Sequence, residues 1–312
     1  METLILNKNT LSKAAQLLRK GELVAFPTET VYGLGAPIFS PETIQKIYKV
    51  KKRPQDNPLI AHMGSIVDHE KLTIDVPSLF FQLAEAFFPG PLTLVVKKNP
   101  QVPAIVSAGL STIAVRMPSH PIASALISEL GEPIVAPSAN LSGRPSSTTA
   151  QHVLSDFDGK IAAVVDGGPC LHGMESTVID LVSFDRPTLL RPGALKKEAI
   201  ERVLGLDVGV YTRGPRTSPG MRYRHYSPDI PVHVFLEKQP FESHLSQKQK
   251  TLVLSTEEHA FPHFFLESTT LYSNLRLAEE NGYDEVVIYC PDGASEALQN
   301  RLEKIAHESN HH

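Results

Sequence analysis

Apolar residues recur along the first two hundred positions in short segments that alternate between a helical and an extended pattern. Leu11, Ala14, Ala15 and Leu18 are spaced as one face of a helix, and Gly21 follows them as a residue suited to a helix C-terminus. The adjoining run ELVAF is typical of a buried strand. Further strands are predicted at residues 92–96, 113–117, 134–136, 161–165, 177–181 and 188–190, and further helices at 77–88, 121–130 and 196–204. Strands and helices mixed in this way predict an α/β or α+β domain built on one sheet.

Another helix is predicted to begin after Ser40. Ser40 is a favourable N-cap, Pro41 suits the first turn, and Glu42 places an acid near the positive end of the helix dipole. Ile44 and Tyr48 then contribute to an apolar face.

The composition changes after about residue 206. Residues 209–228 contain four arginines, one histidine and no acid, and they follow neither a helical nor a strand period. Such a segment predicts a functional linker, because loops longer than about 12–15 residues are usually functional or disordered. Strand patterns at 232–236, 251–254 and 285–289 and a helical pattern at 294–307 come next. We therefore expect a first α/β domain at 1–208, a linker at 209–230 and a smaller α/β domain at 231–312.

Charge and cysteine content exclude several classes of protein. The formal net charge is −4 over 312 residues, which argues against a protein that coats nucleic acid or membranes through bulk positive charge. Cys170 and Cys290 are far apart and follow no CxxC spacing, which argues against a disulfide framework and favours a reducing compartment. No run of about 18 apolar residues occurs, and the first ten residues lack the apolar region of a signal peptide. We expect a cytoplasmic protein that does not associate with membranes.

Two polar stretches near the N-terminus are candidates for ligand binding. PTETVYGLG at residues 27–35 directly follows a predicted strand, and its hydroxyls and glycines suit either a close approach to a ligand or a tight turn. A cluster of cations follows at Lys46, Lys49, Lys51, Lys52 and Arg53. Lysines at a helix C-terminus are usually solvated, and that is the interpretation preferred for these four. Arg53 differs, because a planar guanidinium before a proline-rich turn and a buried strand suits phosphate.

Arg116 lies inside the apolar strand of STIAVRMP. A buried arginine is costly unless it is paired, so Arg116 either has a structural carboxylate partner or faces a cleft that receives a ligand carboxylate. Polar residues also gather at later strand ends, in APSANLSG at 136–143, GMESTVID at 173–180 and LRPG at 190–193. Each of these stretches alone is equally compatible with turns and caps.

Several catalytic motifs are absent from the sequence. It contains no GxxxxGK[ST], HExxH or GxSxG, which excludes a P-loop, that zinc-protease signature and a nucleophile elbow. Neither cysteine has an activating partner in sequence. The residues alone thus predict an α/β enzyme that binds anions and polar ligands without a covalent nucleophile or a protein metal cage.

Taken together, these motifs resemble the YrdC/Sua family of threonylcarbamoyl-AMP synthases. The similarity covers about residues 5–205 and rests on PTETVYGLG, KKRPQDNPLIAH, FPGPLT, STIAVRMP, APSANLSG, GMESTVID and LRPG, all in the family's order. The linker sequence SPGMRYRHYSP at 218–228 and parts of the last eighty residues resemble the longer, two-domain Sua-type branch.

The resemblance implies a fold and a reaction. The fold is a YrdC-like twisted open sheet with a large basic cavity, followed by a smaller Rossmann-like domain. The reaction is that of a nucleotidyltransferase: bicarbonate carboxylates the nitrogen of L-threonine, and the product attacks the α-phosphate of ATP to give threonylcarbamoyl-AMP and pyrophosphate. Separate threonylcarbamoyl transferase machinery then uses the adenylate to make N6-threonylcarbamoyladenosine in tRNA.

The resemblance also assigns residues by their position in the motifs. The residues expected to bind L-threonine, with Arg116 on its carboxylate, are Thr30, His62, Arg116, Ala136 and Ser176. The residues expected to bind ATP are Arg53, Asn57, Thr112, Ser138, Ser146, Arg191 and Tyr226, the last reaching back from a linker that acts as a lid. Magnesium is expected to accompany ATP, held mainly by phosphates and water rather than by protein carboxylates.

Two alternatives compete with this interpretation. A carbamoyl transferase on the same fold would need zinc-finger and acylphosphatase domains, for which the chain has neither the length nor the cysteines. A non-catalytic module for RNA binding or ribosome maturation would need broad phosphate contacts and stacking aromatic residues. Tryptophan is absent and aromatic residues make up only 7%, which favours the synthase.

Overall fold

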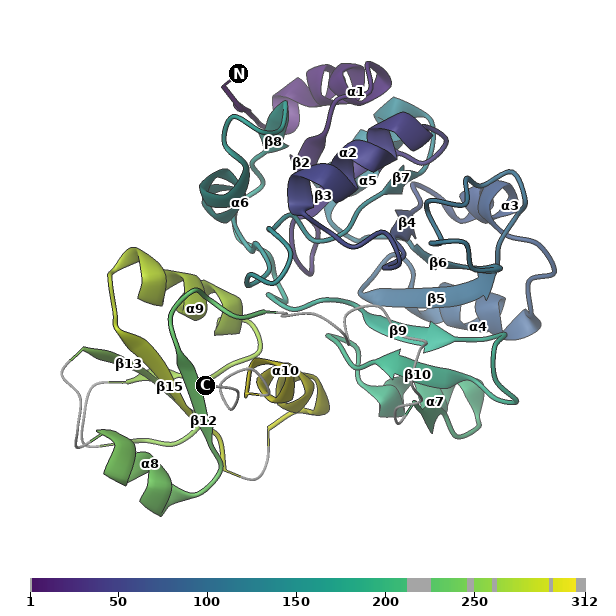
Figure 1. Ribbon diagram of the computed structural model, residues 1–312. Helices are drawn as coiled ribbons and strands as arrows, with labels where there is room; N and C mark the ends of the chain where they lie inside the picture. Colours follow the sequence, from purple (N-terminus) through teal and green to yellow (C-terminus); the bar gives the residue numbers. More distant parts are fainter. Residues whose placement is uncertain (1, 212–225, 246–249, 260–262, 292–293, 307–312) are drawn as a thin grey trace. The chain divides into compact units, whose positions relative to one another are not determined.

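The computed structural model describes residues 2–211, 226–245, 250–259, 263–291 and 294–306 (Figure 1). The chain divides into two compact units. Unit 1 comprises Met1–Leu141 and Ser147–Arg222, and unit 2 comprises Ser142–Ser146 and Tyr223–His312. The short segment Ser142–Ser146 therefore belongs with the C-terminal part of the chain, although the residues on both sides of it belong to unit 1.

A mixed, twisted sheet runs the length of unit 1 (Figure 1). In the described residues its strands are, in spatial order, β1 (Leu4–Leu6), β8 (Ala163–Val165), β2 (Val24–Phe26), β3 (Gly33–Pro37), β7 (Ile134–Val135), β4 (Ile60–His62), β6 (Thr112–Arg116), β5 (Leu92–Lys97), β9 (Thr177–Asp180), β10 (Thr188–Arg191) and β11 (Gly209–Val210). The sheet contains both parallel pairs, such as β4 with β6, and antiparallel pairs, such as β5 with β6. This confirms the predicted α/β class with one sheet.

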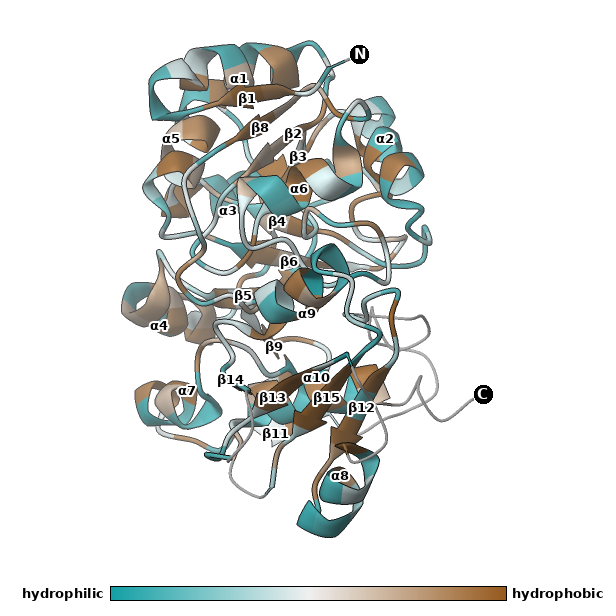
Figure 2. Ribbon diagram, turned by 90° about the vertical axis from the view of Figure 1, so that its left-hand side faces the viewer, coloured by the Kyte–Doolittle hydropathy of each residue, from teal (hydrophilic) through white to brown (hydrophobic). Residues whose placement is uncertain are grey.

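Helices cover both faces of this sheet and bury its apolar side chains. The helices of unit 1 are α1 (Leu11–Arg19), α2 (Pro41–Lys51), α3 (His69–Leu72), α4 (Ser78–Phe87), α5 (Pro121–Leu130), α6 (Ala150–Phe157) and α7 (Lys197–Leu204), with 3-10 turns at Lys8–Thr10 and Ile66–Asp68. Val24 packs in a core with α1 and α5, whereas the next residue, Ala25, packs in a second core with α2, α4, α6 and α7. Successive side chains of a strand point to opposite faces, which accounts for the two cores. In Figure 2 the strands are brown and the outward helix faces carry teal.

Local signals explain the ends of several helices. Pro121 opens α5 at its first turn, and Gly131 closes it in the left-handed region at φ 85°. Pro41 likewise opens α2, as predicted. Ser40 stands at the N-cap, but its hydroxyl bonds to Oγ1 of Thr43 at 2.7 Å and makes no capping bond to the backbone, so the predicted cap is wrong in that detail.

Unit 2 has a parallel sheet of its own. Within its described residues the spatial order is β12 (Val232–Phe235), β15 (Glu285–Tyr289), β13 (Thr251–Ser255) and β14 (Phe264–Phe265), and the helices are α8 (Lys238–Leu245), α9 (Leu271–Glu280) and α10 (Glu296–Ala306). All three strand pairs are parallel, in agreement with the predicted second α/β domain. No helix in the described ranges is long and apolar enough to cross a membrane.

Arg276 of α9 connects the inserted segment to unit 2. The guanidinium is fully buried and donates from Nε and Nη2 to the carbonyl of Pro145, at 3.2 and 2.6 Å. Arg144 forms an ion pair with Glu279 on the same helix. These bonds give residues 142–146 a fixed place in unit 2.

Candidate functional site

The predicted buried arginine has an acidic partner. Arg116 ends β6 with 4% of its surface exposed, and its Nη2 donates to Oε1 of Glu29 at 2.7 Å. Glu29 follows β2 and also accepts a bond from the backbone N–H of Ser119 at 3.1 Å. The Nε of Arg116 has no hydrogen-bond partner among the described residues. Arg116 thus has a structural carboxylate partner, and its Nε is a buried donor that this partner does not occupy.

His62 lies beside this ion pair on the neighbouring strand. β4 and β6 are parallel, and their register sets His62 directly opposite Arg116. Burial, reinforced by the charge of Arg116, lowers the pKa of His62 from 6.5 to about 3, so the imidazole is neutral at physiological pH. Its Nδ1 is 3.2 Å from the carbonyl of Ile60, which can only accept, so Nδ1 carries the proton and Nε2 is left as an acceptor.

The charge of Glu29 depends on the same contacts. Burial raises the pKa of this carboxyl group, but the positive charge of Arg116 and the hydrogen bonds from Arg116 and the backbone outweigh it and lower the pKa below 4.5. Glu29 is therefore ionised at neutral pH and compensates the buried guanidinium.

A second buried group lies where β5 and β9 begin. The hydroxyl of Ser176 is 2.7 Å from that of Thr93, and Arg191 donates to the hydroxyl and the carbonyl of Ser176 at 3.1 and 2.9 Å. The backbone of Gly193 lies very close to that of Glu175: a Cβ at position 193 would be 2.4 Å from the carbonyl oxygen of Glu175. Glycine permits this close approach of two backbones, which places Arg191 against Ser176. Arg191, predicted for ATP, is thus in contact with Ser176, predicted for threonine.

Thr30 lies in a tight turn after β2. The hydroxyls of Thr28 and Thr30 are 2.8 Å apart, and Thr28 Oγ1 also donates to the carbonyl of Val31 at 2.6 Å. The turn places Glu29 within reach of Arg116. The turn expected in PTETVYGLG is thus present at residues 28–31, and the approach of a ligand to this segment stays a prediction.

Residues predicted to bind ATP gather at the other end of β4. Arg53 donates from Nε to the carbonyl of Asn57 and from Nη2 to that of Pro58, at 3.2 and 3.0 Å. The side-chain Oδ1 of Asn57 is buried without a hydrogen-bond partner in the described structure. Thr112 is the first residue of β6. Ala114 of β6 pairs with Ile60 of β4, and the two strands are parallel. Two residues earlier in the same register, Thr112 therefore lies opposite Pro58.

Lys51 connects this group to the loop after β7. Its ammonium donates to the carbonyls of Ser138 and Asn140, and only 1% of the residue is exposed. The prediction that the lysines of this cluster are solvated is therefore wrong for Lys51, although Lys46, Lys49 and Lys52 are exposed. The start of the same loop is fixed by the N–H of Ala136, which donates to the carbonyl of Ile60 at 3.0 Å.

Two further residues predicted to bind ATP belong to unit 2. Ser146 is buried in the segment that Arg276 holds. Tyr226 adopts a left-handed backbone at φ 67°, and its ring stacks on Tyr272 with centroids 5.4 Å apart. The guanidinium of Arg301 lies 5.3 Å from the centroid of the Tyr226 ring. Residues 212–225 of the predicted linker lie outside the described residues.

Within unit 1 the predicted residues thus form two groups at the two ends of a short strand. His62, Arg116, Ser176 and the Thr30 turn lie toward the carboxyl end of β4, and Arg53, Asn57 and Thr112 lie before its start. Pro58 and His62 are four residues apart, which spans about 13 Å of extended chain. The sequence does not single out Glu29 or Thr93 for the site, and its pattern favours a solvated Lys51. An acid within a run of hydroxyls, and a lysine at an apolar helix position, are the signals that point to Glu29 and Lys51.

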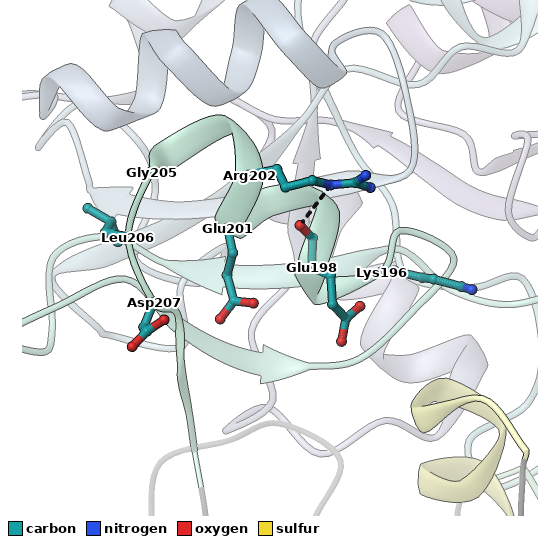
Figure 3. Close-up of a pocket in the computed structure, with 7 residues that line it drawn as sticks. All are labelled: Lys196, Glu198, Glu201, Arg202, Gly205, Leu206 and Asp207. Atoms are coloured by element: carbon teal, nitrogen blue, oxygen red, sulfur yellow. Dashed lines mark hydrogen bonds between the residues drawn. The ribbon is translucent and has the colours of Figure 1, made fainter.

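Two other features of unit 1 do not suit anion binding or nucleophilic catalysis. An open depression of about 740 Å³ beside α7 is lined by Lys196, Glu198, Glu201, Arg202, Gly205, Leu206 and Asp207 (Figure 3). Its three carboxylates oppose an anionic ligand, and its arginine donates to the backbone carbonyl of Glu198.

Burial raises the pKa of Cys170 to about 12, which disfavours the thiolate that a nucleophile requires.

Side chains suited to metal binding converge at one place in the described residues. His233, His244 and Glu285 of unit 2 form this group, and unit 1 contributes no comparable set of three His, Cys, Asp or Glu side chains in its described part.

Comparisons with known proteins identify the family of the chain. Residues 16–193 match the profile of the Sua5–YciO–YrdC family, described as "Telomere recombination", and residues 195–307 match "Threonylcarbamoyl-AMP synthase, C-terminal domain". A threonylcarbamoyl-AMP synthase of Bacillus subtilis is 44% identical over 96% of this chain and 94% of its own length. The synthase of Schizosaccharomyces pombe is 38% identical over 96% of this chain and 88% of its own. The crystal structure of P. abyssi Sua5 complexed with L-threonine has a TM-score of 0.90 at 38% identity and covers 98% of each chain.

Proposed function

The chain belongs to the Sua5–YciO–YrdC family, in the branch that carries the threonylcarbamoyl-AMP synthase C-terminal domain, and on this premise we propose its reaction and its site. The protein is a threonylcarbamoyl-AMP synthase that uses ATP and L-threonine as substrates. Relatives that match nearly the whole chain carry this enzymatic name, which favours catalysis over a non-catalytic RNA-binding role.

The observation that carries the assignment of the threonine site is the buried group of Glu29, Arg116 and His62. Threonine offers a carboxylate and an ammonium group. The carboxylate binds the donors of Arg116 that Glu29 does not occupy, in a charge-assisted, forked contact. The neutral imidazole of His62 accepts a hydrogen bond through Nε2 without repelling the ammonium group. Thr30, Ala136 and Ser176 complete this proposed subsite.

ATP is proposed to bind at the other group. Arg53, Asn57, Thr112, Ser138 and Ser146 would hold the nucleotide, and the orphaned Oδ1 of Asn57 is the acceptor that supports this most directly. Arg191 is proposed at the boundary between the two substrates, since it bonds to Ser176 while its charge suits a phosphate. Tyr226 is proposed as a further contact to the nucleotide.

The chemistry requires no covalent enzyme intermediate. The ammonium group of threonine first loses a proton to water. The free amine then attacks bicarbonate and water leaves, which gives a carbamate. A carbamate oxygen then attacks the α-phosphorus of ATP, the bond to the bridging oxygen breaks, and pyrophosphate departs. Orientation of bound reactants contributes about 7–11 kcal/mol in favourable cases. Fixed cations such as Arg53 and Arg191 stabilise the charge that develops on the transferred group.

Magnesium and the downstream partners belong to the same proposal. Magnesium would accompany ATP through phosphate oxygens and water, because the described part of unit 1 does not bring three acidic or histidine ligands together. The adenylate would pass to a threonylcarbamoyl transferase acting on tRNA, and we place the reaction in the cytoplasm, where these partners occur.

Pyrophosphate release by the full-length protein tests the proposed reaction. The assay contains ATP and magnesium and compares the effects of adding threonine, bicarbonate, or both, with the adenylate detected by mass spectrometry. We expect release to require both additions. Release from ATP alone, or a folded protein that binds ATP and makes no adenylate, would contradict the proposal. Arg202→Met removes a surface arginine away from both groups and serves as a control with full activity.

A further inference from the structure

Three side chains of unit 2 meet although they lie far apart in sequence. His233 is on β12, His244 on α8 and Glu285 on β15. Oε2 of Glu285 is 3.5 Å from Nε2 of His233 and 3.1 Å from Nε2 of His244, and the three ligand atoms all lie within 4.8 Å of one another. The two imidazole centroids are 4.6 Å apart.

The fold itself produces this convergence. β12 and β15 are parallel neighbours, and His233 pairs with Val287, so Glu285 lies two residues earlier on the same face of the sheet. α8 covers that face through Phe241, which is buried in a core with Val287 and Tyr289. His244 follows Phe241 by three residues and therefore projects from the same side of the helix.

The spacing of the three atoms is that of a metal site. Zinc binds histidine nitrogen and carboxylate oxygen at about 2.0–2.2 Å in tetrahedral geometry, which places neighbouring ligand atoms about 3.3–3.5 Å apart. The two measured nitrogen-to-oxygen separations fall within a few tenths of an ångström of that value. The third separation, between the two histidine nitrogens, is at most 4.8 Å, so a common ion requires the two imidazoles to adjust around the carboxylate.

The surroundings favour a cation further. Glu285 is 1% exposed, and a carboxylate buried to this degree needs positive charge or several hydrogen bonds nearby. Thr251 of β13 pairs with Glu285 in register, and its hydroxyl donates to the other carboxylate oxygen, Oε1, at 2.7 Å. This bond orients Oε2 toward the imidazoles, as outer hydrogen bonds orient ligands in known metal sites. Both histidines are only half-buried, so solvent reaches the group.

We propose that His233, His244 and Glu285 form a binding site for a divalent metal ion of the zinc class, with a fourth coordination position open to solvent. Imidazole and carboxylate ligands suit zinc and its neighbours, whereas magnesium and calcium prefer oxygen ligands alone. The ligands come from a strand, a helix and a second strand, so the ion would tie α8 to the sheet of unit 2. Their sequence spacing matches no metal motif, which is why the sequence predicts no such site.

Zinc titration of the metal-stripped full-length protein tests this proposal, with free Zn²⁺ reported by a competing chromophoric chelator. We expect one equivalent to bind tightly and to raise the thermal unfolding temperature, because the ion binds the folded state. His244→Ala and Glu285→Gln should weaken binding at least about 100-fold, and Thr251→Val, which removes only the orienting bond, about 10-fold. His69→Ala, a histidine of unit 1 outside the group, is the matched control and should leave binding unchanged.

The outcomes separate a metal site from a simple ion pair. Since His307, His311 and His312 can also bind zinc, the titration is repeated with all three replaced by serine. The proposal would be overturned if binding disappeared with that replacement. It would also be overturned if binding were unchanged in His244→Ala, Glu285→Gln and Thr251→Val. A lack of binding by the folded wild-type protein would overturn it as well and would leave the two histidines as hydrogen-bond partners of Glu285. Glu285→Gln preserves the shape of the side chain, and circular dichroism verifies that each variant is folded.

Discussion

The guanidinium of Arg116 and the carboxylate of Glu29 form a buried ion pair at 2.7 Å, although the two residues are 87 positions apart in sequence. Removing either partner of such a pair leaves an uncompensated buried charge, which costs about 3–5 kcal/mol. Loss of either partner would therefore destabilise unit 1, and the pair fixes the orientation of the guanidinium. Its remaining donors can then bind a ligand without first being ordered.

Arg116→Lys should raise the KM for threonine at least about 10-fold, because lysine keeps the charge but loses the forked donor geometry. The KM for ATP should change little, since Arg53 and Asn57 lie at the other end of β4. Steady-state pyrophosphate release at varied threonine and varied ATP measures both constants. An equal rise in the two would remove Arg116 from the threonine subsite. Lysine is chosen over alanine so that Glu29 keeps a cationic partner.

His62 should make the stability of unit 1 depend on pH. Its pKa is about 3 in the folded protein and 6.5 in the unfolded chain, so the unfolded chain binds a proton first as the pH falls. The free energy of unfolding should decrease by up to about 1.4 kcal/mol per pH unit below about 6.5. Urea unfolding between about pH 7 and about pH 5 measures this slope.

His62→Gln should reduce that slope, and His120, His172 and His259, whose pKa values burial also lowers, account for the slope that remains. The lowered pKa of Glu29 acts in the same direction but only below 4.5, outside this range. An unchanged slope in His62→Gln would show that His62 is not the residue responsible.

Lys51→Met should weaken ATP binding and destabilise the protein. The ammonium of Lys51 donates to the carbonyls of Ser138 and Asn140, and a buried carbonyl that loses its partner costs about 1–3 kcal/mol. The loop carrying Ser138 would loosen, so the KM for ATP should rise more than that for threonine. Thermal unfolding and the same kinetic assay measure the two effects. Lys49→Met removes an exposed lysine two positions earlier and should be neutral in both.

Gly193→Ala should impair the use of both substrates, threonine and ATP. The added methyl group would lie 2.4 Å from the carbonyl oxygen of Glu175 and the carbonyl carbon of Ser176, so the backbone must shift. That shift would separate Arg191 from Ser176 and lower kcat/KM for threonine and for ATP. At Gly209 an added Cβ meets side-chain atoms of Arg186 and Thr188 at 3.1 and 3.2 Å, which makes Gly209→Ala the milder control. Equal activity of the two variants would mean that this backbone contact does not position Arg191.

Much of the fold was predictable because hydrophobic periodicity is a local property. The helix at Pro121–Leu130 and the strand at Glu285–Tyr289 occur within the predicted bounds, since their caps and apolar spacing lie within the segments themselves. β3 was not predicted, because Gly33–Pro37 is rich in glycine and reads as a turn. Its neighbours β2 and β7 supply the pairing that makes it a strand.

The sequence by itself determined the class of fold, the family and the motifs that carry the chemistry, because each of these is a pattern of nearby residues. Only the tertiary structure decided which distant residues meet: Glu29 with Arg116, Lys51 with Ser138, and His233 with Glu285. These contacts follow from strand order and register. Both depend on how the whole sheet packs, and no local spacing encodes them.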